Sequence, residues 1–179
     1  MRGTYHVIGG IAMLVMADSA LLRIAPQAHD AAMAALWSFP PWPATFVLGC
    51  LLPDVDSRGS ILGRHLRLPL GHRTWTHSLW PALALSAIAW LVPPAAPAIL
   101  SLVAGMVTHL ALDAVSVAGI CWLYPWPSFR HYPSGAFVKR SNLHHRCFRW
   151  YHTGRRSETV VLVAFCLAAI ASIIVARLA

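Results

Sequence analysis

The stretch Leu51–Ser57 reads LLPDVDS and places two carboxylates beside a proline, directly after an apolar run. The chain contains only six acidic residues in all, so two of them within such a short stretch stand out. A second stretch, residues 71–78, reads GHRTWTHS and ends where the next apolar run begins. Neighbouring carboxylates repel each other unless a cation or a proton lies between them. We therefore expect a metal site at a membrane surface, with further ligands supplied by other parts of the chain.

The composition is typical of an integral membrane protein. Hydrophobic residues make up 58% of the 179 residues and charged residues 11%, well below the roughly 25% charged residues of a soluble domain. The mean hydropathy of +0.59 agrees with this class. The four cysteines have no paired spacing, which argues against a disulfide framework. We expect one all-α membrane domain over residues 1–179, with the N-terminal apolar run kept as a span rather than removed as a signal sequence.

Five apolar runs predict about five transmembrane helices. They cover Tyr5 to Ile24 and residues 44–53, 78–92, 98–118 and 159–176. The first run is long enough to cross a hydrocarbon core of about 30 Å as a helix. The second is short, and it completes a span only if residues 31–37 contribute or if the helix is tilted or partly buried in protein. Between these two segments, Phe39–Pro43 reads FPPWP and predicts a rigid, aromatic interfacial turn.

The basic residues predict the orientation of the chain. All 14 of them except Arg23 and Arg177 lie at Arg2, in residues 58–73 or in residues 130–156. With five spans these three regions fall on one side of the membrane, and the positive-inside rule makes that side cytoplasmic. The net charge of +8 is therefore explained by orientation in a membrane, and no nucleic-acid partner is expected.

The same topology brings scarce ionisable residues to one depth. The candidates are His6 at the start of the first span, Asp54 and Asp56 after the second, His72 and His77 before the third, His109 and Asp113 in the last turns of the fourth, and Glu158 at the start of the fifth. Histidines scattered through a helical core would not gather at one level in this way. The sequence therefore predicts a metal site at the cytoplasmic ends of the spans.

Two pairs within this set allow alternatives. His109 and Asp113 are four residues apart, so they share one helix face inside an apolar segment, where ionisable groups need a partner. The alternatives are a bound divalent cation and a buried His–Asp hydrogen bond between helices. Asp54 and Asp56 would point to the same side of an extended segment, but Asp-x-Asp also occurs in solvated turns and helix caps.

The ligand types favour a transition metal. Imidazole and carboxylate groups together suit Zn²⁺ best, with Mn²⁺ or Fe²⁺ as alternatives, and the number of candidates allows one or two ions. Asp56 and Glu158 are expected either as ligands or as the general base, and Arg73 as a clamp for an anionic group. The chain has no Gly-x-Ser-x-Gly nucleophile motif and no phosphate-binding Gly-x-x-x-x-Gly-Lys loop. Hydrolysis by a metal-activated water fits better than a covalent serine mechanism or an ATPase.

The order of these motifs resembles a known family. The motifs are His6, LLPDVDS at 51–57, His72-Arg73-x-x-Thr76-His77-Ser78, His109-x-x-x-Asp113, Trp126-Pro127 and Gly154-x-x-Ser157-Glu158. Together they resemble the bacterial inner-membrane metal-dependent hydrolases, also labelled LexA-binding inner membrane-associated hydrolases, over nearly the whole chain. The resemblance implies a metal-dependent hydrolase without fixing its substrate.

A more distant likeness is to zinc-dependent phospholipase C, a soluble helical enzyme that cleaves phosphodiesters. It implies as ligands His6, one of Asp54 and Asp56, one of His72 and His77, His109, Asp113 and Glu158. The chain departs from that pattern four residues before Glu158, where it has Gly154 instead of histidine, which puts a third metal in doubt.

The sequence thus supports three functional hypotheses. The first is hydrolysis of a phospholipid or a lipid-phosphate ester at the cytoplasmic face of the membrane, with membrane lipids as partners. The second is a non-enzymatic membrane adaptor that recruits a soluble protein through its basic loops. The third is an ion or proton pathway that uses the same buried groups.

Overall fold

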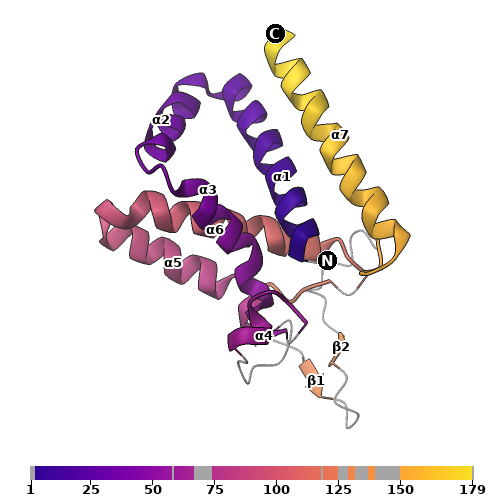
Figure 1. Cartoon of the computed structure of the whole chain (residues 1–179). Helices are drawn as coiled ribbons and strands as arrows, with labels where there is room; N and C mark the ends of the chain where they lie inside the picture. The colour runs from indigo at the N-terminus through magenta and orange to yellow at the C-terminus, as the bar shows by residue number, and fades with distance from the viewer. Residues whose placement is uncertain are drawn as a thin grey trace.

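The computed structural model describes residues 3–57, 59–66, 74–117, 119–124, 129–131, 137–139 and 150–178. In chain order its elements are α1 (Gly3–Ile24), α2 (Pro26–Trp37), α3 (Trp42–Leu51), the 3-10 turn η1 (Leu52–Asp56), α4 (Gly63–Leu66), η2 (Trp75–His77), α5 (Trp80–Leu91), η3 (Pro93–Ala95), α6 (Ala96–Ala114), β1 (Phe129–His131), β2 (Phe137–Lys139) and α7 (Arg156–Leu178). Helices dominate the fold, as the sequence predicts (Figure 1).

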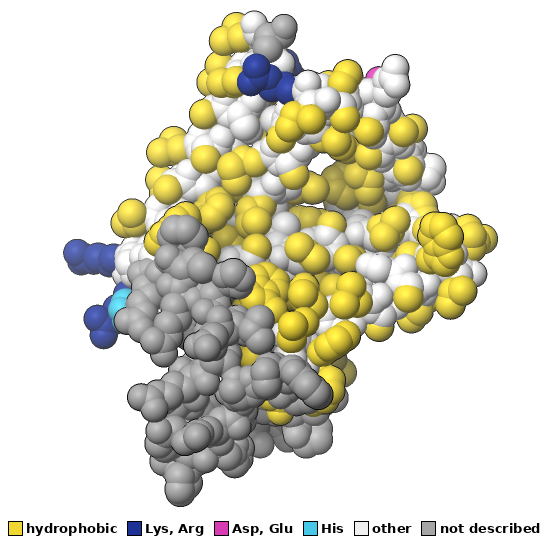
Figure 2. All heavy atoms as spheres, turned by 180° about the vertical axis from the view of Figure 1, so that it is seen from behind, with side chains coloured by type: hydrophobic (Ala, Val, Ile, Leu, Met, Phe, Trp, Pro, Cys, Tyr) yellow, Lys and Arg dark blue, Asp and Glu magenta, His cyan; other side chains and the backbone are white. Residues whose placement is uncertain are grey.

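Three helices are long and apolar enough to cross a membrane. They are α1, α7 and the continuous segment Pro93–Ala114 formed by η3 and α6. Figure 2 shows apolar side chains spread over the described residues of one face, with few Lys or Arg side chains between them. Trp90 and Leu91, for example, are 85% and 76% exposed, which suits contact with lipid rather than water. The structure is therefore that of a helical membrane protein.

The predicted count of five spans is not confirmed. Helix α5 has only 12 residues and is about 18 Å long, too short to cross a hydrocarbon core of about 30 Å. Segments Pro26–Trp37 and Trp42–Asp56 qualify only as a pair, and they are bent by 93°. The described residues thus contain three candidate spans, or four if the bent pair counts as one.

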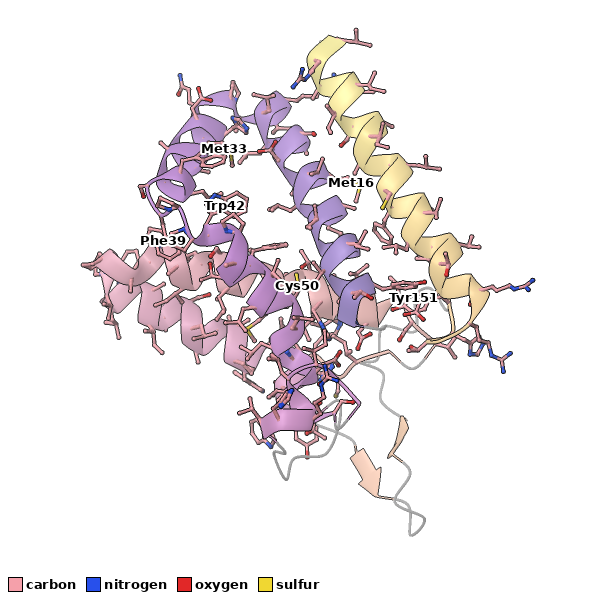
Figure 3. All side chains as sticks on the ribbon, in the orientation of Figure 1. Met16, Met33, Phe39, Trp42, Cys50 and Tyr151 are labelled. Atoms are coloured by element: carbon pink, nitrogen blue, oxygen red, sulfur yellow. The ribbon has the colours of Figure 1, made fainter. Side chains whose placement is uncertain are left out.

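The bend between α2 and α3 lies at the predicted proline-rich turn. Proline has no backbone N–H and disrupts a helix interior, but it fits the first turn of a new helix, where Pro43 stands in α3. Phe39 and Trp42 lie at the bend, and Cys50 lies further along α3 (Figure 3). The turn redirects the chain so that the end of α3 runs into η1 and its two carboxylates.

Helix α3 packs against α6 with backbone close to backbone. A Cβ atom at Gly49 would overlap the carbonyl oxygen of Leu102, and one at Gly105 would overlap the carbonyl oxygen of Phe46. Small residues are typical where transmembrane helices approach closely. This contact fixes α6 against the segment that leads into η1.

Helices α1 and α7 run in the same direction along each other (Figure 1). Tyr5 contacts Thr159 at the start of both helices, with their hydroxyl oxygens 3.2 Å apart, and Ser172 donates to Ser19 further along. The segment before α7 is tied to the end of α6, because the buried Tyr151 hydroxyl donates to the carbonyl oxygen of Leu112. Both helices therefore begin at the level where α6 ends.

Two short strands depart from the all-α prediction. β1 and β2 form one antiparallel pair, with Arg130 opposite Val138. They lie between the fourth and fifth predicted apolar runs, residues 98–118 and 159–176, where no helix is predicted. The pair contributes no residue to the cluster described below.

Candidate metal centre

Four elements far apart in the sequence bring a cluster of buried His and Asp side chains together. Helix α1 supplies His6, η1 supplies Asp54, η2 supplies His77, and α6 supplies His109 and Asp113. The three histidines are 0% exposed and Asp113 is 1% exposed. Burial of ionisable groups is unfavourable unless they are paired or bind a metal, so the cluster calls for a physical explanation.

Three ligand atoms form a triangle of the right size for a metal ion. The Nε2 atom of His77 lies 3.4 Å from Asp54 Oδ1 and 3.4 Å from His109 Nε2, and the third side measures 3.8 Å. Ligands bound to Zn²⁺ at about 2.0–2.1 Å in a tetrahedron lie about 3.3–3.4 Å apart. A shift of a few tenths of an ångström would bring the three atoms to that spacing.

Asp113 lies beside this triangle of atoms. Its Oδ2 atom lies 3.6 Å from His77 Nε2 and 3.9 Å from His109 Nε2. Asp113 therefore borders the group of Asp54, His77 and His109, and it belongs to the second candidate ligand group, with His6 and His109. This donor set is the one that Zn²⁺, Mn²⁺ and Fe²⁺ accept.

The backbone orients His109 as a ligand. Its Nδ1 atom lies 2.7 Å from the carbonyl oxygen of Cys50, so Nδ1–H donates and the neutral ring keeps its lone pair on Nε2. Metal-bound histidines usually donate their second ring N–H to an oxygen in this way. This partner cannot be predicted from the sequence, because a backbone carbonyl leaves no signature in the side-chain pattern.

Asp56 and Thr76 orient His77 from the opposite side of its ring. The Nδ1 atom of His77 lies 3.5 Å from Asp56 Oδ2 and 3.1 Å from Thr76 Oγ1, and the Thr76 hydroxyl donates to the same carboxylate. Burial disfavours the charged form of His77, but the adjacent carboxylates of Asp54 and Asp56 outweigh it and raise the pKa of His77 above its ordinary value. The charge of Asp56 thus acts on His77 at the nitrogen that faces away from the other ligands.

The different positions of Asp54 and Asp56 follow from the local backbone. In an extended segment they would point to one side, but η1 is a 3-10 turn, with about three residues per turn, so side chains two positions apart diverge. Pro53 favours this turn at its start, and Ser60 donates to the carbonyl oxygen of Asp54 to hold it. Gly63 packs over the turn, where a Cβ would overlap the backbone of Ser57. The two carboxylates consequently face different nitrogens of His77.

His6 forms a second group with His109 and Asp113. Its ring stacks on His109 with centroids 3.7 Å apart, and its Nε2 atom lies 3.5 Å from Asp113 Oδ1. Within the described part of the chain, neither ring nitrogen of His6 has a hydrogen-bond partner, although the side chain is fully buried. A buried imidazole without a hydrogen bond is costly, and a cation at this position would satisfy it. The two oxygens of Asp113 face the two groups, so one ion or two ions fit.

Glu158 occupies a separate position at the start of α7. Its carboxylate is 1% exposed and accepts the N–H of Gly154, whose φ of +80° suits glycine. The two candidate ligand groups among the described residues include neither Glu158 nor Asp56. The predicted roles of these two residues as ligand or base stay predictions. His72 and Arg73 lie outside the described residues, so their predicted roles stay predictions as well.

The family of the chain follows from comparison with known proteins. The family model described as YdjM inner membrane protein matches residues 1–179. The chain belongs to the YdjM inner membrane protein family. This confirms the resemblance to a bacterial inner-membrane family that the motifs carry. No solved structure matches the chain.

Two relatives show how far the similarity to YdjM family members extends. The chain is 32% identical to the inner membrane protein YdjM of Escherichia coli K12 over 139 residues, which cover 70% of this chain and 66% of that protein, slightly less than two thirds. It is 30% identical to the protein YvsG of Bacillus subtilis strain 168 over 177 residues, which cover 94% of this chain and 91% of YvsG.

Proposed function

We propose that the protein is a metal-dependent hydrolase of the inner membrane that acts on a phospholipid or a lipid-phosphate ester. One observation carries the proposal. Asp54, His77 and His109 form one buried group whose ligand atoms lie 3.4–3.8 Å apart, and Asp113, 3.6 and 3.9 Å from the two Nε2 atoms, belongs to a second group with His6 and His109. Such a cluster suits a cation, since its members otherwise present acceptors or like charges to each other.

The chain's own residues would divide the work at the centre. Asp54, His77, His109 and Asp113 would hold the ion, which supplies Lewis acidity and lowers the pKa of a bound water. Asp56 would keep the proton of His77 on Nδ1, so that Nε2 stays available as a ligand. The attacking water also needs a general base, for which Asp56 and Glu158 are the candidates. Arg73 is the candidate for the clamp on an anionic group.

The orientation is part of the proposal. Arg155 and Arg156 stand at the start of α7, and Arg64 lies in α4, close in sequence to η1. Basic residues at one end of apolar helices favour the cytoplasmic side. The centre, which lies where α1 begins and α6 ends, would then open toward the cytoplasm.

Metal analysis of the purified protein is the first test. Wild-type protein should hold one or two equivalents of a transition metal, measured by inductively coupled plasma mass spectrometry. His109→Ala and Asp113→Ala should each lose it. His29→Ala is the matched control, because His29 contacts Asp18 and Asp30 at the opposite end of α1 and stands outside both ligand groups. Wild-type protein without stoichiometric metal would refute the proposal.

Turnover is the second test. Metal-loaded protein should hydrolyse bis(p-nitrophenyl) phosphate, a soluble phosphodiester, and phospholipid in mixed micelles, and the Asp113→Ala variant should do neither. Protein that holds metal but cleaves no ester would end the hydrolase proposal and favour the adaptor function. Proton flux in vesicles that disappears in Asp113→Asn would instead favour an ion pathway.

A further inference from the structure

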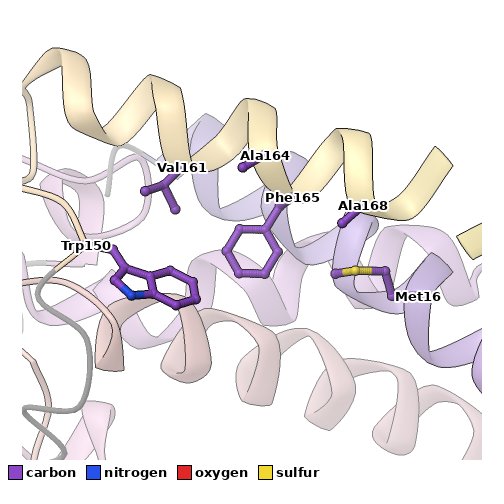
Figure 4. Close-up of a pocket in the computed structure, with 6 residues that line it drawn as sticks. All are labelled: Met16, Trp150, Val161, Ala164, Phe165 and Ala168. Atoms are coloured by element: carbon purple, nitrogen blue, oxygen red, sulfur yellow. The ribbon is translucent and has the colours of Figure 1, made fainter. Parts of the chain in front are cut away.

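An apolar groove runs along the contact between α1 and α7. It encloses a cavity of about 240 Å³ lined by Met16, Trp150, Val161, Ala164, Phe165 and Ala168. Figure 4 shows Met16 from α1 and the rings of Trp150 and Phe165 around the space below α7. The two alanines are one helical turn apart, and their small side chains leave the hollow between larger neighbours. The groove lies between two helices that qualify as membrane spans, so a hydrocarbon chain is its natural occupant.

A polar cavity lies at the start of the same helix pair. Its volume is about 200 Å³, and its lining residues are Tyr5, Gly154, Arg155, Arg156, Glu158 and Thr159. Both arginines are exposed, whereas the Glu158 carboxylate is buried and accepts the Gly154 N–H. Two arginines against one carboxylate leave the cavity with a net positive charge. Arginine side chains of this kind bind phosphate oxygens.

The two cavities follow each other along one face of α7. Glu158, Val161, Phe165 and Ala168 are spaced by three, four and three residues, which places them on one side of the helix. Thr159, which lines the polar cavity, and Ala168, at the far end of the groove, are separated by about 14 Å along the helix axis. Trp150, half-exposed, packs against Phe165 with ring centroids 6.4 Å apart, near the beginning of the groove. Tryptophan prefers the boundary between headgroups and hydrocarbon.

We propose that one anionic phospholipid binds along this α1–α7 contact. Its phosphate lies at Arg155 and Arg156, and one acyl chain lies in the groove. A peptide or a soluble ligand would need polar partners along its length, and among the six lining side chains the groove offers only the indole N–H of Trp150. A zwitterionic lipid should bind less tightly, because the cationic part of its headgroup is repelled by the two arginines.

The location of this lipid gives it a relation to the metal centre. Tyr5 lines the polar cavity and is followed directly in α1 by His6, which belongs to the centre. The bound headgroup therefore lies at the level of the centre rather than at the other end of the molecule. Taking this lipid as the substrate rests on the proposed function, whereas the binding itself does not.

Native mass spectrometry of the detergent-solubilised protein tests the binding. Phosphatidylglycerol and phosphatidylcholine with identical acyl chains are titrated separately, and wild type should retain phosphatidylglycerol more strongly. Replacing Arg155 and Arg156 by glutamine should lower the preference for phosphatidylglycerol about fivefold for each arginine replaced. This is the effect of one basic side chain near an anionic surface. Arg177→Gln, at the other end of α7, should leave it unchanged.

A second variant tests the groove. Ala164→Trp should weaken binding of both lipids about tenfold, the effect of roughly two methylene groups leaving the groove. Ala171→Trp is the matched control, because Ala171 is exposed on the same helix and does not line the cavity. Equal retention of the two lipids by wild type would overturn the proposal. Full lipid binding by Ala164→Trp would overturn it as well. If this variant misfolds, the variants of the exposed Arg155 and Arg156 still test the proposal through their preference for phosphatidylglycerol.

The two proposals fail separately. Turnover of bis(p-nitrophenyl) phosphate by the same preparations reports the metal centre without any lipid. Selective lipid retention without this turnover would refute the hydrolase proposal and support the lipid-site proposal. Turnover of the soluble ester without lipid selectivity would overturn the lipid site and keep the hydrolase.

Discussion

Replacing Asp56 by asparagine separates two roles that the sequence leaves open for this residue. The structure puts Asp56 against Nδ1 of His77, 3.5 Å away, while Asp54 lies 3.4 Å from Nε2. A residue that orients a histidine ligand typically changes metal affinity by about 10–100-fold when it is lost, which is about 1.4–2.7 kcal/mol. We therefore expect Asp56→Asn to lower Zn²⁺ affinity by that amount, while the site of this variant is still fully occupied at saturating Zn²⁺. Asp54→Asn, which removes a direct ligand, should lose more.

The assay is a competition titration of metal-free protein with Zn²⁺ and a chromophoric chelator. It is repeated over a range of pH, because the charge of Asp56 helps to raise the pKa of His77. Asp56→Asn should therefore shift the pH dependence of binding to lower pH, an effect that a purely structural substitution would not cause. Thr76→Val, which removes the hydroxyl that donates to Asp56, should change affinity in the same direction and by less. An unchanged affinity in Asp56→Asn, or a loss as large as that of Asp54→Asn, would refute the orienting role.

Three further predictions concern the centre and its support. In the wild type, Zn²⁺ affinity should fall as the pH is lowered through the raised pKa of His77, because this ligand must lose its proton to bind. An affinity that stays constant over the range in which histidine titrates, about pH 5 to 8, would contradict this. Gly105→Ala should lower the thermal midpoint in detergent through a loss of about 1–3 kcal/mol, since its Cβ meets backbone of α3, whereas Gly59→Ala, with its nearest neighbour 4.0 Å away, should not. Tyr151→Phe should cost about 0.5–1.5 kcal/mol in the same melting experiment, because the buried carbonyl oxygen of Leu112 loses its hydroxyl donor; an unchanged midpoint would show that this bond contributes nothing.

The long spans were predictable and the short elements were not. Uninterrupted apolar runs mark α1, α6 and α7, because a membrane helix needs about 20 apolar residues and little else. Residues 78–92 look similar in composition, yet α5 ends at Leu91 ahead of Pro93 and starts only at Trp80. Composition alone does not tell a short helix packed on α6 from a span. The position of the bend after α2 was predictable from the proline-rich turn, but its angle of 93° was not.

The members of the cluster were more predictable than their arrangement. Five buried residues, His6, Asp54, His77, His109 and Asp113, lie together as the sequence suggests, because acidic residues are scarce and histidines recur at the ends of apolar runs. Which side of His77 each carboxylate faces depends on the 3-10 turn at η1, which a pattern of two aspartates around one valine does not specify. The stacking of His6 on His109 depends on the approach of α1 to α6, a tertiary contact with no local signal.

The clustering of these residues does not depend on the number of membrane spans, for a physical reason. It requires only that each segment begin or end at one level, and short or bent segments can do so as well as full spans. Helices α1 and α7 begin there, and α3 ends there at η1; α5 leaves that level after His77, and α6 returns to it at His109 and Asp113. Since α5 is about 18 Å long and the segment Pro93–Ala114 about 33 Å, α5 alone cannot cover α6. The close packing of α3 at Gly105 covers α6 further along and holds its last turns beside η1, so the α3–α6 contact positions His109 and Asp113 relative to Asp54.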